Sequence, residues 1–133
     1  MVRESLFGCS FASSEDMLRP SQVAGRVGKT ANGVRFSISR DGKEIARAYL
    51  YVMRNDLHQE PFGPLEDVYV EESDRGGGLG TSLVREVVGA ARDAGCYKLV
   101  ATSRTSRPEV HELYRHLGFA DHGIEFRMNL TGK

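Results

Sequence analysis

Several features are scarce or missing in this chain of 133 residues. It contains no tryptophan and only two cysteines, and no apolar run approaches the roughly 18 residues needed to span a bilayer. The apolar stretch at residues 6–12 is too short and too poorly flanked to indicate a signal peptide. Neither sign of charge is in excess, since 18 basic residues balance 18 acidic ones and the formal net charge is +0. We therefore expect a cytoplasmic protein that binds neither nucleic acid nor a membrane.

Patterns of metal ligands are also missing. Cys9 and Cys96 lie far apart in the sequence, and two cysteines are too few for a disulfide scaffold. His58, His116 and His122 have no ligand-like spacing with a cysteine or with a pair of carboxylates. We expect two plain thiols and no metal site.

The length and the 40% content of hydrophobic residues fit one domain. Residues 1–32 form a poorly defined N-terminal arm, whose one weak helical stretch runs from Ser14 to about Val27 and is interrupted by Pro20. From residue 33 the hydrophobic periodicity becomes clear. We therefore place the folded domain at residues 33–133.

Strand and helix patterns alternate along this domain. Val34, Phe36 and Ile38 alternate with polar residues, and Asp41-Gly42 predicts a tight hairpin turn, because these two residue types tolerate positive φ. Strands are expected over residues 34–38, 45–53, 65–70, 97–102 and 124–130, and helices over residues 83–94 and 106–118. The helix between the third and fourth strands predicts a right-handed parallel βαβ unit. The predicted fold class is α/β, with an antiparallel N-terminal hairpin and a parallel βαβ unit in one mixed central sheet flanked by helices.

A glycine-rich turn, Arg75-Gly-Gly-Gly-Leu-Gly80, lies between the third strand and the first helix. Such a turn presents unpaired backbone N–H groups at the positive end of the helix dipole, which is a binding site for phosphate. The P-loop pattern needs Gly-Lys-Ser/Thr, and this turn continues Gly80-Thr81; the Rossmann pattern G-x-G-x-x-G does not fit either. ATP and NAD are therefore disfavoured as ligands.

The turn fits the pattern R-x-x-G-x-G, and it follows the strand LEDVYV and precedes a second helix HELYRHLGF. In this order the chain resembles the GNAT superfamily of acyl-CoA N-acyltransferases over roughly residues 33–130. The resemblance implies a GNAT-type fold and acetyl-CoA as cosubstrate. It implies that the pyrophosphate is held by Arg75, Gly76, Gly77, Gly78, Leu79, Gly80 and Thr81, and the pantetheine arm by Val68, Tyr69 and Val70. Within the turn we expect the backbone amides to contribute more to phosphate binding than the Arg75 side chain does.

Acyl transfer to an amine needs a group that takes a proton from the ammonium form of the substrate. Glu66 and Asp67 are adjacent in a strand, so we expect them on opposite faces of the sheet, with only one facing the reaction. The strand resembles that of polyamine acetyltransferases, which makes Glu66 the first choice as base. Asp67 is expected to bind the substrate and is the second choice as base. The alternative is that either carboxylate only anchors a strand end or a loop.

The departing thiolate of coenzyme A needs a proton or a hydrogen bond. Tyr114 occupies the tyrosine of Leu-Tyr-x-x-x-Gly-Phe, which in many GNAT members is the general acid; the alternative is a core aromatic whose hydroxyl is satisfied elsewhere. His111 lies one helical turn earlier and is a candidate to contact the substrate or to position Tyr114, although packing or capping is the commoner role.

Two features depart from the family pattern. Many members carry an asparagine seven residues before the tyrosine, whereas this chain has Arg107, so that contact with the cofactor cannot be transferred. The arm of 32 residues is short for the two helices that usually precede the hairpin. The resemblance then implies an open acceptor pocket or help from a second subunit in a homodimer.

These residues predict direct transfer of an acetyl group from acetyl-CoA to a primary amine. Four carboxylates in or near the presumed acceptor region, those of Asp56, Glu60, Glu66 and Asp67, favour a small cationic amine such as a polyamine or an amino-acid derivative. A protein or peptide amino group is the alternative acceptor. A non-catalytic acyl-CoA-binding module is the alternative from another class of protein.

Overall fold

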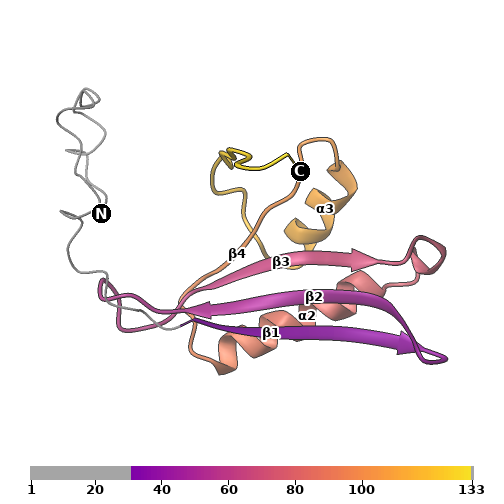
Figure 1. Cartoon of the computed structure of the whole chain (residues 1–133), viewed down its shortest axis with the longest axis horizontal. Helices are drawn as coiled ribbons and strands as arrows, with labels where there is room; N and C mark the ends of the chain where they lie inside the picture. The colour runs from indigo at the N-terminus through magenta and orange to yellow at the C-terminus, as the bar shows by residue number, and fades with distance from the viewer. Residues whose placement is uncertain (1–30, 133) are drawn as a thin grey trace.

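The computed structural model describes residues 31–132, which form a four-stranded sheet and two α-helices. The elements follow in the order β1 (Ala31–Arg40), β2 (Lys43–Met53), β3 (Gly63–Val70), the short 3-10 helix η2 (Glu72–Asp74), α2 (Leu79–Asp93), β4 (Leu99–Ala101) and α3 (Pro108–His116) (Figure 1). The strand order is β1-β2-β3-β4, with β1, β2 and β3 antiparallel and β4 parallel to β3. The predicted mixed sheet is confirmed. The helical stretch expected between Ser14 and Val27 lies outside the described residues.

The hairpin between β1 and β2 forms where the sequence predicts it. Asp41 and Gly42 have φ values of 54° and 79°, the left-handed pair that a tight two-residue turn requires. The pairing then continues to Ala31 opposite Met53, so β1 begins before the expected residue 34. Backbone pairing with β2 extends this strand beyond its apolar residues.

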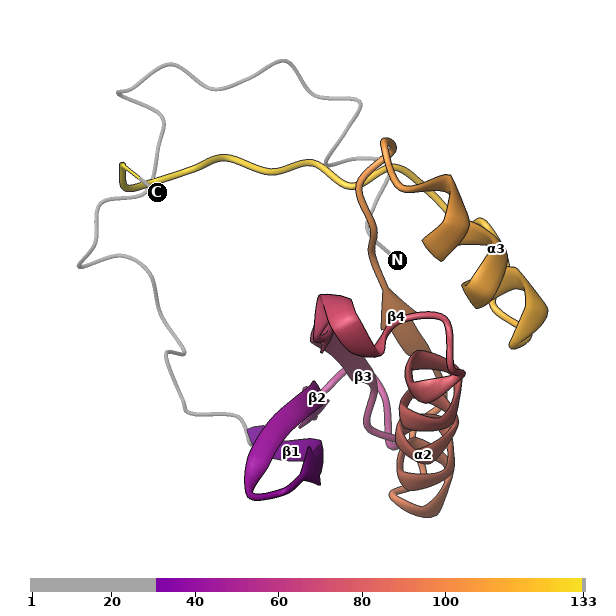
Figure 2. The ribbon, with the colours of Figure 1, turned by 90° about the vertical axis from the view of Figure 1, so that its right-hand side faces the viewer.

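The hydrophobic core lies between the sheet and α2, which runs along one face of the sheet (Figure 2). The helix contributes side chains that recur every three or four residues, and the two central strands contribute the facing layer. The buried residues are Leu83, Val84, Val87 and Ala91 of α2 and Ala46, Ala48, Leu50 and Leu65 of β2 and β3. Among residues 31–132, no helix has the length and apolarity to cross a membrane.

Leu50 is a test of this core. Its side chain is 1% exposed and belongs to the central cluster. Leu50→Ala is expected to lower the free energy of unfolding by about 2–5 kcal/mol, because it removes buried methyl groups and leaves a cavity. Equilibrium urea unfolding measures this change. Leu57→Ala is the matched control, since Leu57 is 76% exposed and its replacement should change stability by less than about 0.5 kcal/mol.

The parallel pair β3 and β4 is short. The strand expected over residues 97–102 is observed only at Leu99–Ala101, and its pairing with β3 ends at Leu65 opposite Ala101. On its other side β3 stays paired with β2 up to Val70. The two parallel strands therefore diverge, and residues 66–70 have one edge that no other described strand covers.

The predicted last strand is wrong. Residues 119–132 contain no strand, and Ile124, Phe126, Met128 and Leu130 are between 80% and 90% exposed. Alternation fixes which side chains share a face, but a strand forms only where a neighbouring backbone accepts and donates its hydrogen bonds. None of the other strands within residues 31–132 pairs with this segment.

Candidate active site

A cavity of about 720 Å³ lies where β3 and β4 diverge. Its walls come from the second half of β3, the glycine-rich turn that enters α2, and α3. The predicted site residues that line it are Glu66, Asp67, Val68, Tyr69, Val70, Arg75, Gly76, Gly78, Leu79, Gly80, Thr81 and Tyr114. Gly77 and His111 do not line it. The structure thus brings the presumed base, the presumed acid and most of the cofactor turn together.

A β-bulge distorts β3 at the centre of this cavity. Tyr49 pairs with Glu66 and Arg47 pairs with Tyr69, so the single residue between them on β2 faces two on β3. Asp67, the first of these two, has φ 51°, in the left-handed region. The bulge breaks the alternation of side chains. The strict alternation that predicts Glu66 and Asp67 on opposite faces of the sheet therefore does not hold here, and both residues line the cavity.

The glycine-rich turn keeps its amides open. Gly76 and Gly78 have φ values of 89° and 87°, which other residues rarely adopt, and Gly78 is the residue that caps α2. Within the described part of the chain, no group accepts a hydrogen bond from the N–H of residues 76–81. These donors meet the positive end of the α2 dipole at the edge of the cavity. The donor set suits a diphosphate.

Arg75 is fixed against the end of β3. Its Nε donates a hydrogen bond to the carbonyl oxygen of Val70 over 2.8 Å, and its guanidinium lies 5.6 Å from the centre of the Tyr69 ring. Arg47 approaches the same ring at 4.8 Å. The side chain of Arg75 therefore holds the turn to the strand and adds positive charge beside the open amides.

The electrostatics of Glu66 and Tyr114 suit a proton acceptor and a proton donor. Burial raises the pKa of the Glu66 carboxyl, and the negative charges of Asp67 and Glu125 raise it further. Burial also raises the pKa of the Tyr114 hydroxyl, with a second contribution from the charge of Glu66. Neither polar group has a hydrogen bond or ion pair with another residue in the described range 31–132. The alternative was that the Tyr114 hydroxyl is hydrogen-bonded within the core, but no described residue forms such a bond with it.

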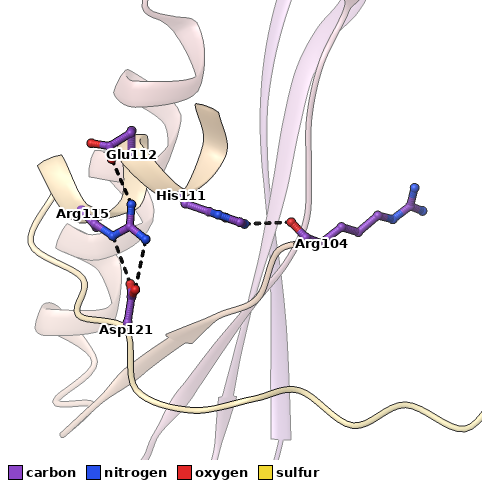
Figure 3. A network of polar contacts seen from close by, with 5 residues as sticks. All are labelled: Arg104, His111, Glu112, Arg115 and Asp121. Atoms are coloured by element: carbon purple, nitrogen blue, oxygen red, sulfur yellow. Dashed lines mark hydrogen bonds and ion pairs between the residues drawn. The ribbon is translucent and has the colours of Figure 1, made fainter. Parts of the chain in front are cut away.

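His111 lies on another side of α3. Its Nε2 is 2.8 Å from the carbonyl oxygen of Arg104 (Figure 3). His111 lines a second, neighbouring groove. Arg107 does line the cavity, and its Nε forms an ion pair with Glu109 over 2.6 Å. Among residues 31–132, no group of three or more His, Cys, Asp or Glu side chains is placed to hold a metal ion.

Among the cavity residues that sequence reasoning missed, two charged ones, Glu125 and Arg127, lie in the segment after α3. Their signal was the same alternation that predicts a strand there. Because Ile124, Phe126 and Met128 share one face, the charged residues between them share the other. The alternation alone predicts a role only for the apolar face.

Gly78 offers a direct test of the turn. Gly78→Asp places a carboxylate where the diphosphate would bind, and we expect the Kd for coenzyme A to rise at least about 10-fold, the equivalent of 1.5–3 kcal/mol for a lost charged hydrogen bond. Isothermal titration calorimetry measures it. Gly42→Asp is the matched control, because Gly42 also has a positive φ of 79° and open space around it, but lies in the distant hairpin. An unchanged Kd for Gly78→Asp would contradict the assignment.

Comparison with known proteins identifies the family of this chain. The chain belongs to the acetyltransferase (GNAT) family, whose model matches residues 3–119. The resemblance inferred from the sequence is confirmed, and the match extends into the N-terminal arm.

Individual relatives act on amino sugars by name. Glucosamine 6-phosphate N-acetyltransferase of Trypanosoma brucei brucei is 39% identical over 127 residues, 94% of this chain and 78% of that protein. Aminoglycoside N(6')-acetyltransferase type 1 of Stenotrophomonas maltophilia is 36% identical over 65% of this chain and 57% of its own length. Several curated relatives are matched over only about half of their length. Among solved structures, a Trypanosoma brucei acetyltransferase superposes with a TM-score of 0.66 at 28% identity, covering 74% of this chain and 69% of that one.

Proposed function

We propose that this chain is an acetyl-CoA-dependent N-acetyltransferase that transfers the acetyl group directly to a primary amine. The observation that carries the proposal is one cavity that is lined by most of the turn with open amides, residues 76–81 except Gly77, and also by Glu66 and Tyr114. A nucleotide-binding turn without a proton acceptor would fit a binding module equally well. The cavity contains both the carboxylate of Glu66 and the phenol hydroxyl of Tyr114, and neither has a hydrogen-bond partner among residues 31–132. This combination favours an enzyme.

Each part of the cavity has a role in this reaction. The amides of the turn bind the diphosphate of coenzyme A, and the uncovered edge of β3 at Val68, Tyr69 and Val70 binds the pantetheine arm through its backbone. Glu66 takes a proton from the substrate ammonium, directly or through water. The freed nitrogen attacks the thioester carbon, the C–S bond breaks, and the Tyr114 hydroxyl donates its proton to the departing thiolate. The nitrogen loses a second proton as it becomes an amide, and a proton returns the tyrosinate to its neutral form. No covalent enzyme intermediate is needed.

The charges in the cavity favour an acceptor that carries both signs. Glu66, Asp67 and Glu125 would attract an ammonium group, and four arginines line the same cavity. The lining arginines are Arg75, Arg104, Arg107 and Arg127. A polyamine, which is positive throughout, gains nothing from these guanidinium groups. We therefore refine the expected small cationic amine to an amino sugar, and in particular an amino sugar that carries a phosphate, as the names of the relatives also suggest.

The test is release of coenzyme A thiol from acetyl-CoA with a panel of amines. We expect turnover with glucosamine 6-phosphate, a lower kcat/KM with unphosphorylated glucosamine or an aminoglycoside, and little with spermidine. Turnover with peptide amines alone would contradict the amino-sugar assignment. Coenzyme A binding without any turnover across the panel would favour the non-catalytic module.

A further inference from the structure

A carboxylate lies directly before the turn that is proposed to bind the diphosphate. Asp74 is the last residue of η2, next to Arg75, and its side chain is only 12% exposed. It lines the same cavity as Gly76 and Gly78 of the turn. A poorly solvated negative charge opposes the binding of an anion nearby, because little solvent screens their repulsion. The turn therefore needs a positive charge that offsets Asp74.

The offsetting charge comes from the β1–β2 hairpin. Arg40 is the last residue of β1, and its Nη1 donates a hydrogen bond to Oδ1 of Asp74 in an ion pair between residues 34 positions apart. The backbone brings the two segments together, because the N–H of Glu71 donates to the carbonyl oxygen of Ile45 over 2.7 Å. The hairpin turn and the glycine-rich turn consequently lie at the same end of the sheet (Figure 1).

Arg40 is placed to act on the ligand through Asp74 and not directly. Its own side chain is 60% exposed and does not line the cavity. Arg75 does line the cavity, but its Nε donates to the carbonyl oxygen of Val70. The Ser73 hydroxyl approaches the second oxygen of Asp74, Oδ2, at 3.4 Å and brings no charge. Within the described residues, the guanidinium of Arg40 is therefore the cation that pairs with this carboxylate.

We infer that Arg40 is a positioning residue for coenzyme A, because its guanidinium neutralises Asp74 and so lets the neighbouring turn accept a diphosphate. The inference rests on the proposed function for the identity of the anion. Removing one partner of a poorly solvated ion pair leaves the other charge uncompensated. Loss of Arg40 would therefore weaken the binding of the cosubstrate, while acetyl transfer at Glu66 and Tyr114 would keep its rate.

Arg40→Gln tests the inference by isothermal titration calorimetry with coenzyme A. We expect the Kd to rise about 10-fold, because an uncompensated charge acts on an anion several ångströms away. With glucosamine 6-phosphate as acceptor, the KM for acetyl-CoA should rise with it and kcat should stay the same. Arg35→Gln is the matched control and should leave the Kd unchanged. Arg35 is also an exposed arginine of β1 and pairs with Glu44 over 2.5 Å, but neither residue lines the cavity.

Asp74→Asn distinguishes charge compensation from simple anchoring of the turn. Alone, this variant should bind coenzyme A at least as tightly as the unaltered chain, because the repelling charge is gone. Combined with Arg40→Gln, it should return the Kd to within about 3-fold of the unaltered value, since the two changes act on one interaction. If the ion pair only anchored the turn, Asp74→Asn would itself raise the Kd and the double variant would stay weak. Either result would overturn the inference, and the Asp74→Asn measurement does so even where Arg40→Gln folds poorly.

The failure of this inference can be told from the failure of the proposed function. If the unaltered chain bound no coenzyme A, the proposed function and the role of Arg40 would fall together. If the unaltered chain bound coenzyme A and Arg40→Gln bound it equally well, only the role of Arg40 would be overturned.

Discussion

Tyr114→Phe is expected to lower kcat by about 100- to 10,000-fold, the range associated with removing a positioned proton donor. The variant keeps the aromatic ring that packs against Phe119 at 5.2 Å between ring centres, so the fold of α3 should persist. Only the hydroxyl, which has no other partner among the described residues, is removed. Steady-state kinetics with acetyl-CoA and glucosamine 6-phosphate measure the loss, and calorimetry should give an unchanged Kd for coenzyme A.

The matched control for this change is Tyr97→Phe. Tyr97 is a partly exposed tyrosine that packs against His58, away from the cavity. Its replacement should leave kcat unchanged. If Tyr114→Phe were as active as the unaltered chain, Tyr114 would be a packing residue and the acid would have to be sought elsewhere.

Glu66→Gln is expected to lower kcat/KM by about 100-fold or more, because the amide has the shape of the carboxyl but cannot accept the substrate proton. The unaltered enzyme should lose activity as the pH falls through the pKa of Glu66, since only the carboxylate acts as base. Burial and the charges of Asp67 and Glu125 raise that pKa, so the acidic limb lies above the ordinary glutamate range. The variant should lack this limb. Glu60→Gln is the control and should keep both rate and limb, because Glu60, which the sequence placed near the acceptor region, is exposed before β3 and does not line the cavity.

Asp67→Asn separates the two neighbouring carboxylates. It removes a negative charge that raises the pKa of Glu66, so the acidic limb of kcat/KM should move to lower pH while most of the activity remains. If Asp67 were the base, the variant would lose its activity and the limb together. The pH profiles of the two variants therefore identify the proton acceptor.

The parts of this fold that depend on neighbours in the sequence could be predicted from it. The Asp41-Gly42 turn, the glycine-rich entry to α2 and the apolar spacing of that helix each require particular residue types at fixed positions. They appear where the sequence places them. For the same reason the sequence also indicated the part of the site that β3 and the glycine-rich turn form, since residues 66–81 are consecutive along the chain.

The features that were missed depend on contacts between distant segments. The bulge at Asp67 arises from the register between β2 and β3, which no local pattern of residues 65–70 reveals. The cavity positions of Glu125 and Arg127 depend on where the chain goes after α3. The strand expected over residues 124–130 has the side chains of a strand, but it pairs with no strand among the described residues.

The left-handed backbone at Asp67 limits how this acceptor pocket can be redesigned. At φ 51° only glycine, asparagine and aspartate are accommodated readily. A library that varies position 67 freely would therefore collect variants in which the bulge relaxes and the neighbouring Glu66 moves with it. Altered substrate preference is better sought at Arg104, Arg107 and Arg127, where side chains reach the cavity from backbone without that constraint.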